Sequence, residues 1–411
     1  MNARLWRRGL VAAVVATTMA GGVSTAAADE ARLLTGADPA HAEAQAGDVS
    51  AAGTIVPMPD LGITHRLPAG GMNLWRMPLS ELETGYGQPQ LVKTLNFGGF
   101  SYDNSKTLAG DVGDITASDD GTADHIIWHA QPNGGVLLWA VGGGGDTAPK
   151  LWADLRTGGW SYANSTPMLG DVTGDGWDDL VIAHANGYFG TNIWVFPSDG
   201  SRLGSPQLWM ANPNAWGSTS RFSLADLDGD GQADFVWTFA GSGLLYMPYM
   251  STGSSFSVDG AVNGGPVFVG PSSAGWSFSG SRLLAGDVTG DGLVDLVTVH
   301  SQPGGGMLVW THENCSDGTS FCLRAPVVWQ NLKTGGWSFA GSRQYLADTD
   351  GDWIDDLVSV HSQAGNPGEL VWRALSSGIG FGTPQIVADL KTGGWTYLSS
   401  RETVADLYGE I

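Results

Sequence analysis

Basic residues are scarce in this sequence of 411 residues. It contains 19 lysines and arginines against 41 aspartates and glutamates, which gives a formal net charge of −22. Nucleic acids and anionic membranes attract proteins that carry a surplus of positive charge, so this balance argues against both as partners. Much of the acidity is concentrated in one short loop motif that recurs along the chain, where bound divalent cations would neutralise it.

A hydrophobic run long enough to span a membrane, about 18 residues, is also missing. Near the start, residues 1–28 place arginines before a short apolar run and end in small residues. This is the pattern of a secretory signal peptide, and the adjacent Arg7 and Arg8 leave twin-arginine export open beside the general secretory route. We therefore expect a secreted, extracellular protein without a membrane-inserted segment.

Cysteine occurs only twice, as Cys315 and Cys322 in the segment NCSDGTSFC. In the oxidising compartment that a signal peptide implies, these two residues are expected to form a disulfide across a hairpin tip, with Asp317 and Gly318 in the turn. Two free thiols are the alternative.

Helix signals are almost absent beyond residue 52. The 62 glycines and 18 tryptophans lie among short apolar runs such as GVLLW, NIWVF and MLVW, a composition typical of all-β proteins. Residues 29–52 are Ala-rich, mixed in charge and aperiodic, so we expect a flexible linker or propiece there. The folded part is therefore predicted to occupy residues 53–411.

The stretch Gly170–His184, GDVTGDGWDDLVIAH, alternates oxygen-bearing side chains on a glycine-rich turn. Ca²⁺ takes about six to eight oxygen ligands in irregular geometry, so these residue types favour it over Mg²⁺ or a transition metal. An EF-hand would need a glutamate at position 12, counted from Asp171, but Ile182 stands there inside a strand-like run. The side chains at positions 1, 3, 5 and 9 are Asp171, Thr173, Asp175 and Asp179.

The same loop recurs three more times in register, which indicates a repeat protein. In the last copy Trp353 replaces the glycine at position 6, so weaker binding is expected there. An earlier stretch is irregular: Asp120 and Asp124 fit positions 5 and 9, but about five residues are inserted after Asp111 or Asp114, and we predict no metal. Positions 1, 3, 5 and 9 of the three further copies are Asp226, Asp228, Asp230 and Asp234; Asp287, Thr289, Asp291 and Asp295; and Asp348, Asp350, Asp352 and Asp356.

An aromatic marker recurs in step with the acidic loop, for example as GGWSY, AGWSF and GGWTY. Successive aromatic positions differ by 60, 56, 60, 61 and 58 residues, so six units of similar length follow one another. The pattern within one unit predicts four antiparallel strands, and such a sheet must stack on its neighbours to bury both faces. We therefore predict an all-β, six-bladed β-propeller of four-stranded antiparallel blades. The marker positions are Phe100, Trp160, Trp216, Trp276, Trp337 and Trp395.

The two ends of the chain carry complementary parts of one repeat. Near the C-terminus, ADLYGEI places Asp406 at position 1 of a loop. Near the N-terminus, Asp60 lies five residues before His65, which is the offset of position 9 from the histidine in other copies. We therefore expect N- and C-terminal segments to pair in the sixth blade and to close the ring.

The repeated D-x-[DT]-G-D-G-x-x-D-[LF]-V segment, after a Gly/Ser-rich aromatic strand, resembles the FG-GAP/VCBS repeats of integrin-alpha-like β-propellers over about residues 53–411. The resemblance implies that the four regular loops bind Ca²⁺ between the first two strands of a blade, as several structural ions per chain. Integrin-type propellers usually have more blades than the six units found here. The resemblance also implies that the backbone carbonyls at position 7 complete the sites, those of Trp177, Gln232, Leu293 and Ile354.

Two further residue types recur about once per unit. The histidines could form a ring that binds a ligand or a metal, but their symmetric recurrence favours a hydrogen-bonded structural role. The tryptophans, expected at the ends of the third strands, could be platforms that stack on sugars, or they could be packing between blades. The histidines are His65, His129, His184, His300 and His361, with Phe239 in the third blade, and the tryptophans are Trp75, Trp139, Trp194, Trp310 and Trp372, with Tyr246 in the third blade.

Motifs of catalysis are missing: the sequence has no G-x-S-x-G elbow, no HExxH, no phosphate loop and no cysteine nucleophile with partners. We therefore expect a monomeric binding module for a glycan or another cell-surface ligand, and not an enzyme. The rival hypothesis is a secreted polysaccharide lyase or hydrolase, with His129 or Asp103 at the mouth of the central channel. A scaffold that binds a partner protein is the third hypothesis.

Overall fold

The computed structural model describes most of the chain beyond residue 58. The chain divides into two compact units, residues 1–56 and 57–411, and the first lies outside the described residues. The predictions for the signal peptide, the linker and Asp406 fall outside them as well. The described residues are 59–79, 86–113, 123–142, 148–187, 190–212, 219–241, 243–257, 267–269, 276–316, 321–362, 368–391 and 394–405.

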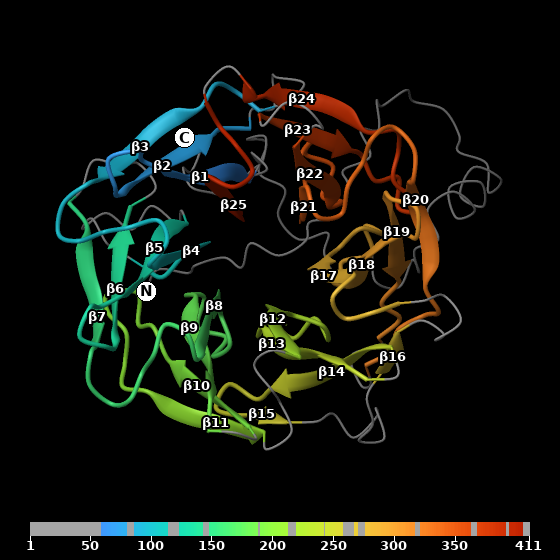
Figure 1. Ribbon diagram of the computed structural model, residues 1–411. Coiled ribbons are helices and arrows are strands. Elements are labelled where there is room, and N and C mark those ends of the chain that lie inside the picture. The colour runs from blue at the N-terminus through green and yellow to red at the C-terminus, as the bar shows by residue number, and fades with distance from the viewer. Residues whose placement is uncertain are drawn as a thin grey trace, which may run out of the picture. The chain divides into compact units, whose positions relative to one another are not determined.

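The described residues form six antiparallel sheets arranged around a common axis, which are the blades of a β-propeller (Figure 1). No α-helix occurs among them, and they include no helix with the length and apolar character needed to cross a membrane. In each blade the strand that follows the aromatic marker lies innermost, and the fourth strand lies at the rim (Figure 1). The predicted all-β, six-bladed propeller is confirmed.

Strands are numbered along the chain, so blade 1 begins at the fourth strand and blade 6 includes the first. The strands of blades 1 to 3 are β4 (Ser105–Gly110), β5 (Asp124–Ala130), β6 (Val136–Val141) and β7 (Lys150–Leu155); β8 (Ser165–Gly170), β9 (Asp179–Ala185), β10 (Thr191–Phe196) and β11 (Gln207–Asn212); and β12 (Ser220–Ala225), β13 (Asp234–Ala240), β14 (Leu244–Ser251), β15 (Phe256–Ser257) and β16 (Val267–Val269). The strands of blades 4 to 6 are β17 (Ser281–Gly286), β18 (Asp295–Ser301), β19 (Met307–His312) and β20 (Val327–Leu332); β21 (Ser342–Ala347), β22 (Asp356–Ser362), β23 (Glu369–Ala374) and β24 (Gln385–Asp389); and β25 (Ser400–Ala405), β1 (Asp60–Arg66), β2 (Met72–Met77) and β3 (Gln90–Leu95).

Burial explains why the second strands lack the alternating pattern of a half-exposed sheet. In β18, DLVTVHS, every residue but the last is buried, because both faces of the blade are covered by its neighbours. The rim strand β20, VVWQNL, buries only its third and sixth residues, Trp329 and Leu332. Burial therefore falls from the second strand of the blade to its rim strand.

The hydrophobic core consists of six clusters, and each lies between two neighbouring blades. One cluster joins Ile126 of blade 1 to Ile182 of blade 2. Another joins Leu74 of blade 6 to Ile127 of blade 1. An open row of six sheets would bury one interface fewer, so six clusters mean that the described blades form a closed ring.

Blade 6 combines the two ends of the described chain. β25 pairs antiparallel with β1, with Asp60 opposite Ala405 and His65 opposite Ser400. The resulting strand order, β25-β1-β2-β3, repeats the inner-to-rim order of the other blades. The C-terminal strand therefore takes the innermost place in a sheet whose other strands come from the N-terminal side.

Blade 3 departs from the four strands predicted for every unit. Its third strand, β14, has eight residues, against six in β10 and in β19. Two short strands, β15 and β16, both pair with β14 in place of one rim strand. Tyr246 of β14 is fully buried, and its hydroxyl lies 2.5 Å from Thr298 Oγ1 of blade 4. A tyrosine with an internal partner thus replaces the tryptophan of the other blades.

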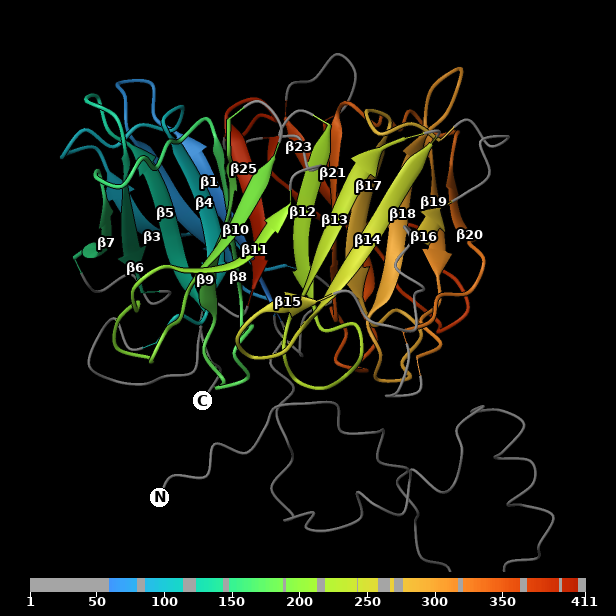
Figure 2. The same ribbon diagram turned by 90° about the horizontal axis from the view of Figure 1, so that it is seen from below.

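Antiparallel alternation places like segments at the same end of the ring (Figure 2). The acidic loops, between first and second strands, lie at one end together with the hairpins between third and fourth strands. We call this the acidic end. The aromatic markers and the turns between second and third strands lie at the opposite end, which we call the marker end.

Candidate functional site

Each regular acidic loop is anchored by the aspartate at position 9, which is the first residue of the second strand. Asp179 is 0% exposed and Asp234 is 1% exposed. Asp179 Oδ2 accepts hydrogen bonds from the backbone N–H groups of Val172 and Thr173, both at 3.0 Å. Asp234 Oδ2 accepts the equivalent bond from Leu227 at 2.8 Å. The position-9 carboxylate therefore fixes the start of the loop against the start of the strand.

The aspartate at position 1 organises the glycine turn. Asp171 Oδ1 accepts hydrogen bonds from the backbone N–H groups of Gly174 and Asp175, at 2.6 and 3.1 Å, and its Oδ2 accepts one from Gly176 at 2.8 Å. Asp226 and Asp287 make corresponding bonds in their own loops. A carboxylate has about four lone-pair sites, so the three bonds to Asp171 leave one, on Oδ2, for a cation.

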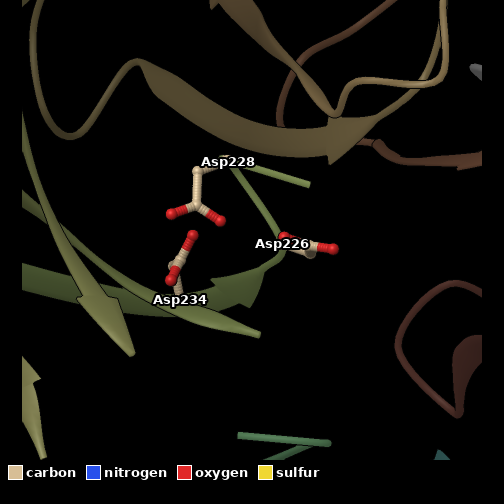
Figure 3. Close-up of side chains that lie close together, drawn as sticks. All are labelled: Asp226, Asp228 and Asp234. Atoms are coloured by element: carbon tan, nitrogen blue, oxygen red, sulfur yellow. The ribbon is translucent and has the colours of Figure 1, made fainter. Parts of the chain in front are cut away.

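Carboxylates converge in two of the four loops in which calcium was predicted. In blade 3, Asp226, Asp228 and Asp234 each offer an oxygen within 4.8 Å of the others, and the carboxylates of Asp228 and Asp234 face each other (Figure 3). Asp230, at position 5, is turned to the Gln232 side chain, whose Nε2 donates to its Oδ2 at 2.8 Å. The converging set of blade 5 is Asp348, Asp350 and Asp352. Blades 2 and 4 gather no group of three carboxylates within the described residues, since threonine stands at position 3.

The loops have unfavourable electrostatics without a counter-ion. Burial raises the pKa of the position-9 carboxyls, to about 8 for Asp234 and to about 7 for its three counterparts. For Asp234 the charges of Asp228 and Asp226 act in the same direction as burial, against the hydrogen bonds from Ser251 and Leu227. A divalent cation among these oxygens would favour the ionised carboxylates. The donor set of carboxylates, hydroxyls and backbone carbonyls fits Ca²⁺.

One loop departs from the others in its backbone. At position 6 the glycines Gly176, Gly231 and Gly292 have φ angles of 93, 101 and 85°, in the left-handed region. Trp353 holds the same place in blade 5 with a φ of 69°, and it is the one residue other than glycine with a positive φ in the described part of the chain. A side chain with a Cβ is strained in this conformation, so this loop is the one that carries backbone strain.

The position-9 aspartate also links neighbouring blades. Asp179 Oδ1 accepts a hydrogen bond from Ser198 N at 2.8 Å, and Ser198 Oγ donates to the carbonyl of Val112 in blade 1 at 2.8 Å. Because Val112 follows the first aspartate of its own loop, consecutive acidic loops are tied together around this end of the ring. Sequence reasoning missed these residues, although a serine or asparagine near the end of the third strand was a visible signal. The equivalents of Ser198 are Ser251, Asn314 and Ser376, which donate to the carbonyls of Val172, Leu227 and Val288.

The recurring histidines are held inside their blades. His129 Nδ1 lies 2.9 Å from Ser105 Oγ, and His184 Nδ1 lies 2.8 Å from Ser165 Oγ, at directly paired positions of adjacent strands. The His129 ring also lies 5.2 Å from the ring of the marker residue Phe100. Burial lowers the pKa of both histidines, which favours neutral rings. These contacts support the structural role of the histidines.

The third-strand tryptophans lie within their strands, and not at the strand ends where the sequence pattern placed them. Trp139 is the fourth residue of β6, and a β-bulge shifts the register with the rim strand between Leu138 and Trp139. The reason is that the strand continues beyond the tryptophan with further apolar residues, which the sequence reading assigned to the hairpin. The same bulge recurs at Trp75, Trp194, Trp310 and Trp372.

Each of these tryptophans is partly buried and paired with two neighbours. Trp194 meets the marker Trp160 at 5.8 Å between ring centroids, with the rings inclined by 78°. Across the bulge, Trp194 is paired in register with Leu208 of the rim strand, which is 50% exposed. We call a tryptophan and its exposed aliphatic partner a rim pair. The other rim pairs are Trp75 with Leu91, Trp139 with Leu151, Trp310 with Val328 and Trp372 with Ile386.

The remaining predicted residues have simpler places. Cys315 and Cys322 form the predicted disulfide, in the hairpin between β19 and β20, while Asp317 and Gly318 lie outside the described residues. Asp103, one of the two residues named for an enzymatic site, forms an ion pair with Arg66. The other, His129, is bonded to Ser105 as described above.

Comparisons with known proteins agree with this architecture. The family description "FG-GAP-like repeat" matches residues 171–237, which span the acidic loops of blades 2 and 3. Together with the six blades, this match supports an FG-GAP repeat β-propeller. No curated protein sequence matches the chain.

Solved structures with a similar fold include fungal lectins. A lectin of Agrocybe aegerita that recognises non-reducing terminal N-acetylglucosamine is 18% identical, with a TM-score of 0.54 over 85% of this chain and 96% of its own. AofleA of Arthrobotrys oligospora is 9% identical, with a TM-score of 0.44 over 85% and 87%. The fucose-recognising lectin of Aleuria aurantia, described as a six-bladed β-propeller, is 11% identical, with a TM-score of 0.43 over 83% and 100%.

Proposed function

We propose that this protein is a secreted, calcium-stabilised β-propeller that binds glycans at its rim. The rim pairs carry the proposal. Five blades each place a partly buried tryptophan beside an exposed aliphatic side chain, at the same bulge and therefore with the same geometry. An aromatic ring with an apolar neighbour and a polar surround suits the C–H face and the hydroxyls of a sugar.

The circular arrangement of the rim pairs supports the proposal that they bind glycans. Five equivalent subsites on one rigid ring can engage several sugars of one polysaccharide or of one cell surface at once, which raises the apparent affinity well above that of a single subsite. Among the described residues blade 3 shows no rim pair, since the fully buried Tyr246 stands in place of the tryptophan. The fold likeness to the Agrocybe aegerita lectin is consistent with such a function.

A glycan array and a polysaccharide pull-down test the proposal. A variant with all five aliphatic partners changed, Leu91→Ser, Leu151→Ser, Leu208→Ser, Val328→Ser and Ile386→Ser, should lose at least about tenfold in apparent affinity, because every subsite loses its apolar neighbour. The matched control changes exposed apolar residues outside the rim pairs, Leu398→Ser and Ile379→Ser, which are 83% and 85% exposed. An empty array, or equal binding by both variants, would refute glycan binding at the rim.

Calcium dependence is tested separately by thermal unfolding. Removal of Ca²⁺ with EGTA should lower the melting temperature, because an ion that binds only the folded loops contributes about 2.7 kcal/mol per site at 100 times its Kd. Re-addition of Ca²⁺ should restore the melt, and Mg²⁺ should restore it less, since it demands stricter geometry. A melt that does not change in EGTA contradicts the calcium part of the proposal and leaves the glycan part standing.

A further inference from the structure

Five of the six innermost strands carry a cationic side chain directly after their first residue, a serine. We call these residues the axial cations. Since the innermost strands surround the axis of the ring (Figure 1), the axial cations form a circle at the marker end. In the sixth strand, β8, the same place is taken by Thr166, which is exposed. The axial cations are Lys106, Arg221, Arg282, Arg343 and Arg401.

Each axial cation lies over an aromatic ring of the next blade. The Arg221 guanidinium lies 4.1 Å from the centroid of Phe278, and that of Arg401 lies 4.1 Å from the centroid of Tyr102 across the closure of the ring. The axial cations also donate hydrogen bonds to backbone carbonyls of the next blade. Lys106 Nζ, for example, donates to Ser165 O at 2.6 Å. The remaining stacked pairs are Lys106 with Tyr162, Arg282 with Phe339 and Arg343 with Tyr397.

Four axial cations form no ion pair with a carboxylate among the residues that the structure describes. Arg343 is the exception, since it contacts Glu402 Oε2 at 2.7 Å. The four others are Lys106, Arg221, Arg282 and Arg401, whose hydrogen bonds go to carbonyl oxygens and, for Arg282, to an amide oxygen.

Cations outside the circle behave differently at the same end of the ring. Arg156 pairs with Asp154, and Lys391 pairs with Asp389 at 3.5 Å. The marker end therefore has carboxylates, but they neutralise peripheral cations. In a chain with 41 acidic residues against 19 basic ones, four axial cations without a carboxylate partner are unexpected.

The axial cations are close enough to repel one another. Burial lowers the pKa of Lys106, and the charge of Arg401 lowers it further. Burial also lowers the pKa of Arg282, with the charges of Arg221 and Arg343 acting in the same direction. Aromatic faces and carbonyl dipoles compensate such partly buried charges only in part, because they bring no net negative charge.

We propose that the axial cations bind an oxyanion group of an extracellular ligand at the marker end of the ring. The shared chemistry is a carboxylate or sulfate oxygen that accepts charge-assisted hydrogen bonds from N–H groups of the axial cations that do not already donate to carbonyl oxygens. The class of ligand that we name rests on the proposed function, the binding of glycans at the rim. The glycan is then an acidic one, with uronate or sulfate groups.

Calorimetric titrations with three oligosaccharides of equal length test the inference: oligogalacturonate, a sulfated chondroitin fragment and neutral chito-oligosaccharide. The double variant Arg221→Gln, Arg401→Gln should bind the acidic probes at least about tenfold more weakly and the neutral probe unchanged, since one charge-assisted hydrogen bond is worth about tenfold. The matched control is Arg324→Gln, at the acidic end, where Arg324 pairs with Glu313. It should bind as the wild type does.

A gain-of-function variant separates binding from folding. Arg→Gln changes also remove contacts between blades, so their loss of affinity is interpreted only when near-UV circular dichroism shows an intact fold. The Thr166 side chain forms no hydrogen bond among the described residues, so Thr166→Arg removes none, and it adds the sixth cation to the circle. It should tighten acidic probes several-fold and leave the neutral probe unchanged. No gain with Thr166→Arg, together with no loss in the double variant, overturns the inference.

The outcomes also distinguish this inference from the proposed function. Binding of the neutral probe alone supports the rim subsites and overturns the axial site. If no oligosaccharide binds but sodium sulfate raises the melting temperature more than sodium chloride of equal ionic strength, and Arg401→Gln removes that difference, the axial oxyanion site stands and the glycan function fails. If no probe binds and sulfate has no specific effect, both fail.

Discussion

The two ends of the innermost strands join neighbouring blades by similar hydrogen bonds but carry opposite charge. At the acidic end, the neutral hydroxyl of Ser198 donates to Val112 O of the preceding blade. At the marker end, the charged ammonium of Lys106 donates to Ser165 O of the next blade. Both bonds end on a backbone carbonyl, so both depend on the same stacking of one blade on another.

The comparison of the two ends shows where charge is left uncompensated. Neutral bridges at the acidic end do nothing to offset the carboxylates beside them, and charged bridges at the marker end bring cations without carboxylates. Each end therefore favours a counter-ion from solution, a divalent cation at one and an oxyanion at the other. The junction of blades 5 and 6 is different, because Arg343 there lies beside two buried glutamates, Glu402 and Glu369, at 2.7 and 3.8 Å.

The largest effect is expected at the acidic end, from loss of a position-9 carboxylate. Asp234→Ala leaves the buried N–H groups of Leu227 and Ser251 without their acceptor, which should lower the free energy of unfolding by roughly 3 kcal/mol. Asp230→Ala, in the same loop but on its exposed side, should cost less than about 1 kcal/mol. Urea unfolding of both variants in EGTA measures the difference, and equal losses would mean that the link between blades is unimportant.

The junction of blades 5 and 6 should make stability depend on pH. Burial and the charge of Glu402 raise the pKa of Glu369 to about 8 from its usual 4.5, against the opposing effects of Arg343 and Ser400. The folded protein thus holds a proton that the unfolded chain releases above pH 4.5. The stabilising contribution of this carboxyl to the free energy of unfolding is complete below that pH and is lost as the pH rises to about 8.

Glu369→Gln separates the contribution of Glu369 to the pH dependence of stability from that of the acidic loops, whose carboxyl groups also have raised pKa values. The free energy of unfolding of the variant, measured by urea from pH 5 to pH 8.5, should fall less steeply than that of the wild type. Glu313→Gln, a variant of a carboxylate paired with Arg324 near the surface, serves as the control and should follow the wild type. Parallel curves for all three proteins would contradict a protonated Glu369.

The smallest effect is expected within one acidic loop, from relief of backbone strain. Trp353→Gly should raise the free energy of unfolding by about 1 kcal/mol, because glycine adopts a φ of 69° without steric cost. Gly176→Ala is the converse change: its φ is 93° and a Cβ there would meet nothing within 4 Å, so strain alone should lower stability by about 1 kcal/mol. If Trp353→Gly destabilises the protein, the tryptophan is held by contacts that outweigh the strain.

Much of the fold was predictable from the sequence because the relevant signals are local. The spacing of about sixty residues, the antiparallel strands of each unit and the disulfide between Cys315 and Cys322 all appear in the structure. Of the candidate metal loops, blades 3 and 5 bring three predicted carboxylates together. The additional strands of blade 3 were not predicted, because the substitution of Tyr246 for tryptophan does not reveal how the rim strand will divide.

The contacts between blades were the part that sequence reasoning missed. The Ser-Arg pair that opens the first strand of four units was visible, for example at Arg282 and Arg343, but its neighbours were not. The partner of Arg282 is Phe339, a ring in the next unit, and the partner of Arg401 is Tyr102, 299 residues away along the chain. The bulges that define the rim pairs depend in the same way on the pairing of two strands.

The sequence by itself determined the unit: its length, its strand order and the oxygen-rich loop, since each is set by hydrophobic pattern and turn chemistry within some sixty consecutive residues. Only the tertiary structure decided which side chains lack a counter-charge. That property depends on the facing surface of the next blade, and it exists only once six blades have closed around one axis. Burial and the distance between charges are properties of that closed ring, and no single repeat contains them.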